Sequence, residues 1–201
     1  LNQLESTVDE RGLETSYTYT SFNAVLTVFK DGETAETRTY DSYGRLSSKQ
    51  FADGNQLTYN YSPAGRLASL SLVNQDSLLM RREYEYNEVG NLVSLDIRTP
   101  DAQQSRRYEY DGLSQLVASY DQNSLIEQFE YDAFGNRIRA RNESGERHFL
   151  YNQANQLVSE WGHNDKAHYG YDMRGNRISR QDGSGQTLYS YNWFNQLTEV
   201  Q

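Results

Sequence analysis

The stretch YDAFGNRI runs from Tyr131 to Ile138, and the closely similar stretch YDMRGNRI runs from Tyr171 to Ile178, 40 residues later in the same chain. A catalytic motif is needed only once, because one active site performs the chemistry. A motif that recurs at fixed spacing is typical of a structural unit that is repeated along the chain. The two stretches therefore indicate a repeat architecture.

Looser copies of the motif extend through the whole chain. Successive anchor tyrosines lie 20 to 25 residues apart, and Asn2-Gln3-Leu4 matches the tail of a further copy. We predict one continuous array over residues 1–201, with about nine to ten repeats, and we expect it to be an internal fragment of a larger protein. The copies are YTSFNAV at Tyr19, YDSYGRL at Tyr40, YSPAGRL at Tyr61, YNEVGNL at Tyr86, YDGLSQL at Tyr110, YNQANQL at Tyr151 and YNWFNQL at Tyr191.

Residues Gln56 to Tyr61 carry the signal of a β-strand, because Leu57, Tyr59 and Tyr61 alternate with polar residues. Residues two apart on a strand share one face of the sheet. An aromatic pair with this spacing recurs, so the pattern predicts an aromatic stripe along one face. The pairs are Tyr17/Tyr19, Tyr84/Tyr86, Tyr108/Tyr110, Phe129/Tyr131, Phe149/Tyr151, Tyr169/Tyr171 and Tyr189/Tyr191.

About five turn-forming residues follow each anchor, and a leucine stands six positions after most anchors. Loops of this composition close β-hairpins, so we expect the anchor and the leucine to be cross-strand neighbours on a buried face. The residues that form this structural motif are Tyr40, Asp41, Gly44, Leu46, Tyr61, Gly65, Leu67, Tyr86, Gly90, Leu92, Tyr110, Asp111, Leu116, Tyr131, Asp132, Gly135, Ile138, Tyr151, Leu157, Tyr171, Asp172, Gly175, Ile178, Tyr191 and Leu197.

A second turn follows about 14 residues after the anchor, for example at Asp31-Gly32 and Asp53-Gly54, so each repeat supplies two strands. The wider steps after Tyr61 and Tyr86 predict longer hairpins. We therefore expect an all-β fold, an antiparallel meander of about 18 to 20 strands. Open sheets seldom exceed about 10 strands without curling, so the meander is expected to form a strongly curved, spiralling sheet.

The repeats at Tyr131 and Tyr171 depart from the pattern. Their branched apolar residue comes seven positions after the anchor, at Ile138 and Ile178, and an arginine stands where leucine is expected. A slip of one residue reverses the face of a side chain. We therefore predict a loop longer by one residue, or a bulge, that returns the isoleucine to the tyrosine face.

Composition excludes several classes of protein. The chain has no cysteine, 36% hydrophobic residues and a net charge of -9. Acidity argues against a nucleic-acid partner, and no apolar run approaches the roughly 20 residues of a membrane span. Neither a thiolate metal site nor a disulfide framework is available without cysteine.

The motif Tyr-Asp-x-x-Gly-Asn/Arg-Leu/Ile, spaced by about 21 residues over essentially the whole chain, resembles the YD-repeat or Rhs-repeat family. That family includes bacterial Rhs polymorphic toxins, the C components of Tc toxins, and teneurins. Ser114 and Asn155 replace the turn glycine, and Asn87, Asn152 and Asn192 replace the aspartate, but these residues also suit turns.

The resemblance implies a β-shell that encloses a polypeptide toxin cargo, in a protein secreted by a bacterium. It implies that the partners are the remaining repeats and the cargo domain of the full-length chain. Bacterial shells of this family end in a self-cleaving segment of Asp-Pro-x-Gly-Leu character. Neither Pro63 nor Pro100 follows an aspartate, so this segment is absent from the 201 residues. Excision from an array also predicts two unpaired strand edges and edge-to-edge self-association.

An enzyme is not expected. Asp41, Asp111, Asp132 and Asp172 each open a turn, where an aspartate caps backbone amides, and neither a nucleophile elbow nor a phosphate loop occurs. We expect no cofactor and no metal. Two metal sites stay as alternatives: a calcium site at the Asp- and Asn-rich turns, and a pair of imidazoles at His163 and His168.

A binding module is the alternative function. Trp161, Trp193 and the tyrosines offer flat apolar platforms with polar edges, which suit a glycan or a surface receptor. The competing interpretation of these residues is cross-strand packing.

Overall fold

The computed structural model describes residues 3–162 and 164–201, and these form an antiparallel meander of 19 strands. No helix capable of crossing a bilayer occurs in this described part. The prediction of an all-β meander is confirmed. The strands are β1 (Ser6–Val8), β2 (Glu14–Tyr19), β3 (Val25–Lys30), β4 (Glu33–Tyr40), β5 (Leu46–Phe51), β6 (Asn55–Tyr61), β7 (Leu67–Asn74), β8 (Ser77–Tyr86), β9 (Leu92–Arg98), β10 (Gln103–Tyr110), β11 (Leu116–Asp121), β12 (Ser124–Tyr131), β13 (Arg137–Asn142), β14 (Gly145–Tyr151), β15 (Leu157–Gly162), β16 (Asp165–Tyr171), β17 (Arg177–Asp182), β18 (Gly185–Tyr191) and β19 (Leu197–Val200).

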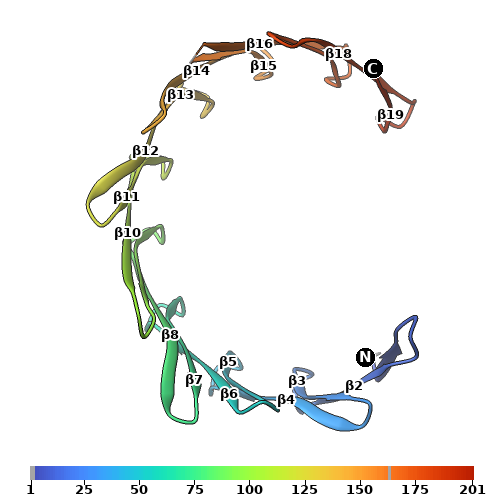
Figure 1. Ribbon diagram of the computed structural model, residues 1–201, viewed down its shortest axis with the longest axis vertical. Coiled ribbons are helices and arrows are strands. Elements are labelled where there is room, and N and C mark those ends of the chain that lie inside the picture. The colour runs from blue at the N-terminus through green and yellow to red at the C-terminus, as the bar shows by residue number, and fades with distance from the viewer. Residues whose placement is uncertain (1–2, 163) are drawn as a thin grey trace. The chain divides into compact units, whose positions relative to one another are not determined.

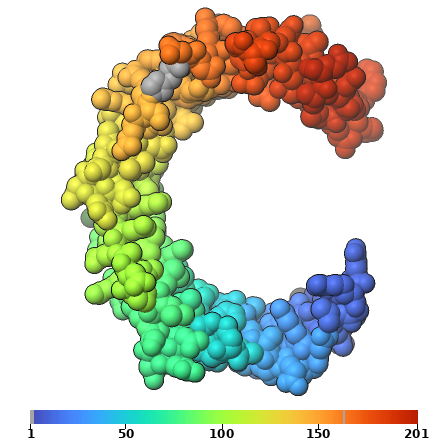
Figure 2. All heavy atoms as spheres, viewed as in Figure 1, coloured from blue at the N-terminus to red at the C-terminus, as the bar shows by residue number. Residues whose placement is uncertain are grey.

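The chain divides into two compact units, Leu1–Arg106 and Arg107–Gln201, with the boundary inside β10. Within each unit the strands follow one another in chain order (Figure 1). Each unit is one sheet thick, as the space-filling view shows (Figure 2). In an antiparallel meander, successive connections lie at opposite ends of the strands. The loops that follow the anchor tyrosines therefore all lie at one end of the strands, which we call the loop edge, and the other turns lie at the opposite end, the opposite edge.

The strand boundaries follow the sequence motif. From Tyr40 onward every anchor ends a strand, and the residue six positions later begins the next strand, as predicted. Tyr61 pairs with Leu67, and Asn60 then pairs with Ser69, so Ala68 is an extra residue in the register. The same shift precedes Tyr40, Tyr86, Tyr131, Tyr151, Tyr171 and Tyr191. A β-bulge beside the loop is therefore a recurring part of the repeat.

The wider repeats contain longer hairpins, as predicted. β7 and β8 have 8 and 10 residues, and β8 includes the run Leu78 to Glu83, whose composition favours helix. Helix propensity is overridden there by the pairing of β8 with β7 and β9. In the following repeat, β9 and β10 have 7 and 8 residues, and a turn from Thr99 to Ala102 takes up part of the extra length.

The turns at the opposite edge are tight reversals. Asp31 and Gly32 have φ angles of 48° and 81°, as a two-residue turn with two positive φ angles requires. Gln75-Asp76 and Gln122-Asn123 also have positive φ at both positions. Gly145 has positive φ directly after the two-residue loop that precedes β14, and it pairs with Asn142 in an unbroken register.

The tyrosine face is half-buried, whereas the sequence predicted a buried face. Among the described residues only Ala118, Phe129 and Ala167 are buried apolar residues, and none of the larger side chains is fully buried. The reason is architectural: a sheet buries a face only where another layer covers it, and each unit has a single layer. The aromatic rings of this face therefore stay in partial contact with solvent, and several of them contact arginine side chains.

Candidate functional site: the tyrosine ladder

Seven of the anchor tyrosines hydrogen-bond to the preceding repeat through their hydroxyl groups, and together they form the tyrosine ladder. The phenol oxygen of Tyr61 donates a hydrogen bond of 2.9 Å to the carbonyl oxygen of Leu46, which begins β5, the strand beside β6. This bond lies at the end of the strand pair, where the regular backbone ladder stops. The equivalent bonds join Tyr19 to Leu4, Tyr40 to Val25, Tyr131 to Leu116, Tyr151 to Arg137, Tyr171 to Leu157 and Tyr191 to Arg177, over 2.6 to 3.2 Å.

The residue after each anchor caps the hairpin loop. Asp132 Oδ1 accepts hydrogen bonds from the backbone N–H groups of Phe134 and Asn136, both at 2.9 Å. Asn152 accepts the corresponding two bonds at 2.9 and 3.0 Å, so an amide oxygen replaces the carboxylate without change of geometry. The same pair of bonds is made by Asp41, Asp111, Asp172 and Asn192.

Charge adds to the cap where the residue is aspartate. The Asn136 side-chain amide donates to Asp132 Oδ2, and this bond, with the backbone N–H donors, holds the pKa of Asp132 below its ordinary value. Asn176 lowers the pKa of Asp172 in the same way. These carboxylates therefore accept hydrogen bonds from the amides of their own loops. Each one belongs to a separate repeat.

The fifth position of the motif needs a left-handed backbone. Gly135 has a φ angle of 83°, and the substitutes Ser114 and Asn155 have φ angles of 63° and 56°. Asparagine tolerates this region better than most residues with a Cβ, so the departures from glycine leave the loop unchanged.

The predicted difference at Tyr131 and Tyr171 is wrong. Arg137 pairs with Tyr131 in the ordinary register, and Ile138 occupies the bulge position that Ala68 and its equivalents occupy elsewhere. Arg177 and Ile178 are arranged alike opposite Tyr171. Because leucine repeats such as that of Tyr61 have the same bulge, the side chain six positions after the anchor faces the tyrosine stripe whether it is leucine or arginine.

Arginine fits this position because its guanidinium group stacks on aromatic rings. Arg137 Cζ lies 5.0 Å from the ring centroid of Phe129 and 5.3 Å from that of Phe149. Arg177 lies 5.5 Å and 5.0 Å from the rings of Tyr169 and Tyr189. Each arginine thus bridges the aromatic residues of successive repeats through cation–π contacts.

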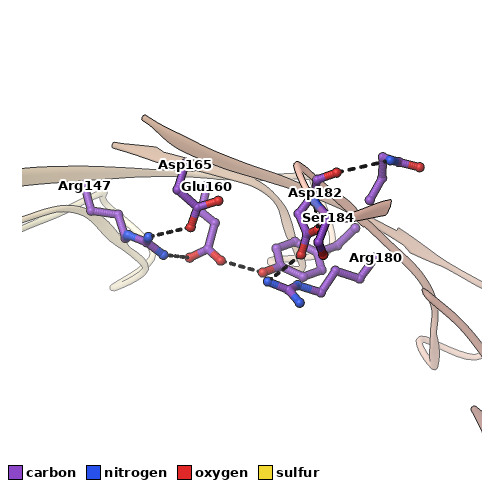
Figure 3. A network of polar contacts seen from close by, with 8 residues as sticks. Arg147, Glu160, Asp165, Arg180, Asp182 and Ser184 are labelled. Carbon is purple, nitrogen blue, oxygen red and sulfur yellow. Dashed lines mark hydrogen bonds and ion pairs between the residues drawn. The ribbon is translucent and has the colours of Figure 1, made fainter. Parts of the chain in front are cut away.

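A polar network crosses the tyrosine face of the second unit (Figure 3). Arg147 forms ion pairs with Glu160, at 3.2 Å, and with Asp165, at 3.0 Å. The Tyr169 hydroxyl donates to Glu160 at 2.5 Å, and burial together with this bond raises the pKa of Tyr169. The face therefore combines aromatic and charged groups, as a surface in contact with water does.

The described residues do not provide a set of ligands for either of the metal sites considered from the sequence. The described residues contain no cluster of three or more His, Asp or Glu side chains placed to hold a metal ion. His163, one of the proposed pair of imidazoles, lies outside the described residues. His168 lies in β16, on the face opposite the tyrosines.

Sequence reasoning missed the tyrosine hydroxyl bonds and the Arg147 network. Strict alternation along β14 and β15 places Arg147 and Glu160 on the same face as Phe149, so the network could have been found from the pairing of these strands. The hydroxyl bonds depend on the twist at strand ends, for which the sequence carries no separate signal.

Comparison with known proteins identifies this arrangement. Residues 63–201 match a family model described as Teneurin YD-shell, and residues 40–75 match one described as RHS Repeat. The toxin protein Tse5 of Pseudomonas aeruginosa is 34% identical over 83 residues, which are 41% of this chain and 6% of that protein. The chain also superimposes on the crystal structure of TcdB2-TccC3-TEV, with a TM-score of 0.59 and 14% identity, over 98% of this chain and 14% of that one.

The chain thus spans only a small part of the length of these two relatives. The solved structure supports the fold alone, because its sequence identity is low. The family model covers more than half of the chain, including the capped loops from Asn87 onward and the ladder bonds of Tyr131, Tyr151, Tyr171 and Tyr191. The chain belongs to the YD-shell family of Rhs-type repeat proteins.

Proposed function

We propose that this chain is a segment of the wall of a YD-repeat shell, and that the shell encloses a polypeptide toxin cargo. The observation that carries the proposal is the construction of each unit: a single sheet whose repeats are joined by backbone pairing and by tyrosine hydroxyl bonds, with few buried apolar side chains among the described residues. Such a sheet can be lengthened repeat by repeat, since each new hairpin needs only the edge of the one before it.

The exposure of both faces supports a wall. An ordinary soluble domain covers at least one face of its sheet with a second layer. Here the tyrosine face holds the charged network of Arg147, Glu160 and Asp165, of which Arg147 and Asp165 remain 40% and 52% exposed in their side chains. A wall has one face toward its contents and one toward the surroundings, and both faces of these units suit contact with water or a polar polypeptide.

Two findings support the proposal that the cargo is a toxin: the chain belongs to the YD-shell family, and it is similar to a protein named as a toxin. We infer that the full-length protein is exported from a bacterium and that these repeats act without catalysis. Containment of this kind works by excluded volume, so no particular side chain of the wall has to recognise the cargo. The aspartates that cap the loops then have a structural role, because their carboxylate oxygens already accept hydrogen bonds from loop amides.

Protease protection of the cargo in the full-length protein tests the proposal. Tyr110→Ala together with Tyr131→Ala removes two half-buried rings, each worth roughly 2 kcal/mol, about half the value of a fully buried aromatic. We expect the double variant to expose the cargo to protease. Asp172→Asn is the matched control, because Asn192 makes the same loop bonds, and it should leave the cargo protected. Continued protection in a double variant whose wall is locally unfolded would overturn containment.

A second function is favoured by one feature of the face opposite the tyrosines. The rings of His148 and Trp161 are stacked, with centroids 5.3 Å apart, beside a hollow of about 520 Å³ lined in part by Leu150, Lys166 and His168. A flat aromatic surface beside a cation suits an acidic saccharide. A glycan array with the intact chain and with Trp161→Ala tests this candidate: saturable binding that is lost in the variant supports it, and absence of binding rejects it.

A further inference from the structure

The stretch YDAFGNRI is tied by a side chain to the loop that follows it. Asn136 lies in the loop after Tyr131, and its side-chain amide donates a hydrogen bond to Oδ1 of Asn155, in the next loop, at 3.0 Å. The same amide group donates to Oδ2 of Asp132, in its own loop, at 2.9 Å. A side-chain amide has two N–H donors, so Asn136 can make both bonds at once. We call the bond from one loop to the side-chain oxygen of the next loop a loop link.

The stretch YDMRGNRI makes the same link two repeats later. Asn176 donates to Oδ1 of Asn195 at 3.1 Å and to Oδ2 of Asp172 at 2.9 Å. In the first unit, the side-chain amide of Gln3 donates to Oδ1 of Asn23 at 2.7 Å, so a longer donor makes the same link. The common element is the acceptor, an asparagine at the left-handed position of the following loop.

The loops of the two stretches do not offer this acceptor to the loop before them. Their left-handed positions are Gly135 and Gly175, and glycine has no side chain. The glutamines of the preceding loops lie over these glycines: a Cβ at Gly135 would stand 2.9 Å from Gln115 Nε2, and one at Gly175 would stand 3.3 Å from Gln156 Nε2. The side-chain oxygen of Gln156 accepts a hydrogen bond from Asn152 of its own loop, at 2.8 Å.

A second contact joins the same hairpins that the loop links join. Arg137 contacts an aromatic ring of its own hairpin and one of the next hairpin, and Arg177 does the same. Between the two linked pairs, the ion pair of Arg147 with Asp165 joins β14 to β16. That ion pair lies near the start of these strands, at the opposite edge. Linked and unlinked neighbours therefore differ at the loop edge.

We propose that the motif YDxxGNRI marks the first loop of a linked pair, and that its asparagine positions the second loop. The loop of Tyr131 then forms one pair with the loop of Tyr151, and the loop of Tyr171 forms another with the loop of Tyr191. The glycine of the motif leaves an unlinked joint before each pair. Linked loops move together, and the loop edge bends at the joint. This pairing gives the motif a reason to recur after two repeats instead of one, and it holds whatever the sheet surrounds.

Amide hydrogen exchange in the intact chain tests the pairing. The N–H of Asn155 donates to a carbonyl oxygen within its own loop, and the N–H of Gly175 does the same one loop later, so each reports the opening of its loop. Asn136→Ala should raise the exchange rate at Asn155 about fivefold, because the loop loses one hydrogen bond. Gln156→Ala is the matched control, one loop later, and should leave the rate at Gly175 unchanged. Equal changes at both positions, or none at Asn155, would overturn the proposal.

A double-mutant cycle separates the link from a general disturbance of the loops. Asn155→Gly removes the acceptor and keeps the left-handed backbone, which Gly135 has in the preceding loop. In this background, Asn136→Ala should no longer change the exchange rate at position 155. An undiminished effect would show that the disturbance passes along the backbone, and the link would be refuted.

A new link should form when an acceptor is supplied at the joint. Asparagine tolerates the left-handed region, and in Gly175→Asn the new side chain would meet Gln156 Nε2, as Asn23 meets Gln3. Gln156→Ala should then raise the exchange rate at position 175 about fivefold in this variant, although it has no such effect in the wild type. If the folded variant shows no coupling, asparagine at this position is not what links the loops, and the proposal fails.

Discussion

The phenol oxygen of Tyr131 donates a hydrogen bond of 2.8 Å to the carbonyl oxygen of Leu116, fifteen residues earlier and one repeat back. The bond closes the end of a strand pair at which the backbone ladder has stopped. Its recurrence at seven anchors gives tyrosine a role in this chain that a purely apolar residue could not fill, because the hydroxyl ties its own repeat to the preceding one.

Removal of the Tyr131 hydroxyl should therefore destabilise the second unit. We expect Tyr131→Phe to lower the free energy of unfolding by about 0.5–1.5 kcal/mol, the net value of one such bond. Urea denaturation followed by circular dichroism measures it. Tyr43→Phe is the control, because the Tyr43 ring is 82% exposed at a loop tip, and it should leave the midpoint unchanged. Equal midpoints for all three proteins would contradict a structural role for the hydroxyl.

The loop cap predicts a dependence on acid. The pKa of Asp132 is lowered in the folded state, so the stabilisation is complete above the ordinary pKa near 4 and is lost as the pH falls through the folded value. Asp132→Asn should retain the loop and reduce this loss, because Asn152 caps its loop with an amide oxygen. Asp132→Ala should destabilise at neutral pH. Thermal melts between pH 3 and pH 7 test both, and a normal acid dependence in Asp132→Asn would count against the cap.

Alkaline pH should also weaken the fold. Burial raises the pKa of Tyr131 and of Tyr171 above 10 in the folded chain, an effect that Arg137 and Arg177 oppose. A raised pKa means that stability is fully present below the unfolded value near pH 10 and is lost as the pH rises through the folded value. Urea midpoints should thus fall above pH 10, and less steeply in Tyr131→Phe. A midpoint that is constant to pH 12 would show that the phenols ionise as freely as in the unfolded chain.

Arg137 should be replaceable by leucine but not by alanine. Leucine occupies the same register position in most repeats, as Leu67 does opposite Tyr61. Arg137→Ala removes both the alkyl chain and the cation–π contacts with Phe129 and Phe149, at a cost of about 1 kcal/mol. Arg137→Leu should have nearly the wild-type melting temperature. If the alanine variant melts with the wild type, the stacked guanidinium contributes nothing to stability.

The sequence specified the strands well because each boundary is marked twice, by an anchor tyrosine at the end of one strand and by turn residues after it. Tyr86 and Leu92 show this directly, since they end and begin β8 and β9. The period of two was also sufficient to place the aromatic pairs on one face.

The prediction that Ile138 faces the tyrosine stripe was wrong because it assumed that side chains alternate regularly between the two faces on both sides of the loop. A bulge adds one residue in the leucine repeat of Tyr61 as well as in that of Tyr131, so the register could not be obtained from the leucine repeats, where the bulge leaves no mark on the pattern. The partial exposure of the tyrosine face was also not predicted. The alternation of apolar and polar residues is the same in a sheet that another layer covers and in one that is uncovered. Exposure depends on whether another layer exists, which a repeat motif does not encode.

Enclosure is the central claim, and imaging the full-length protein by electron cryomicroscopy tests it most directly. The account predicts that residues 3–201 form part of a continuous wall around a closed cavity, with density for the cargo polypeptide on one side of the sheet only. A full-length particle in which both faces of this sheet are open to solvent, with the cargo domain outside, would contradict the account.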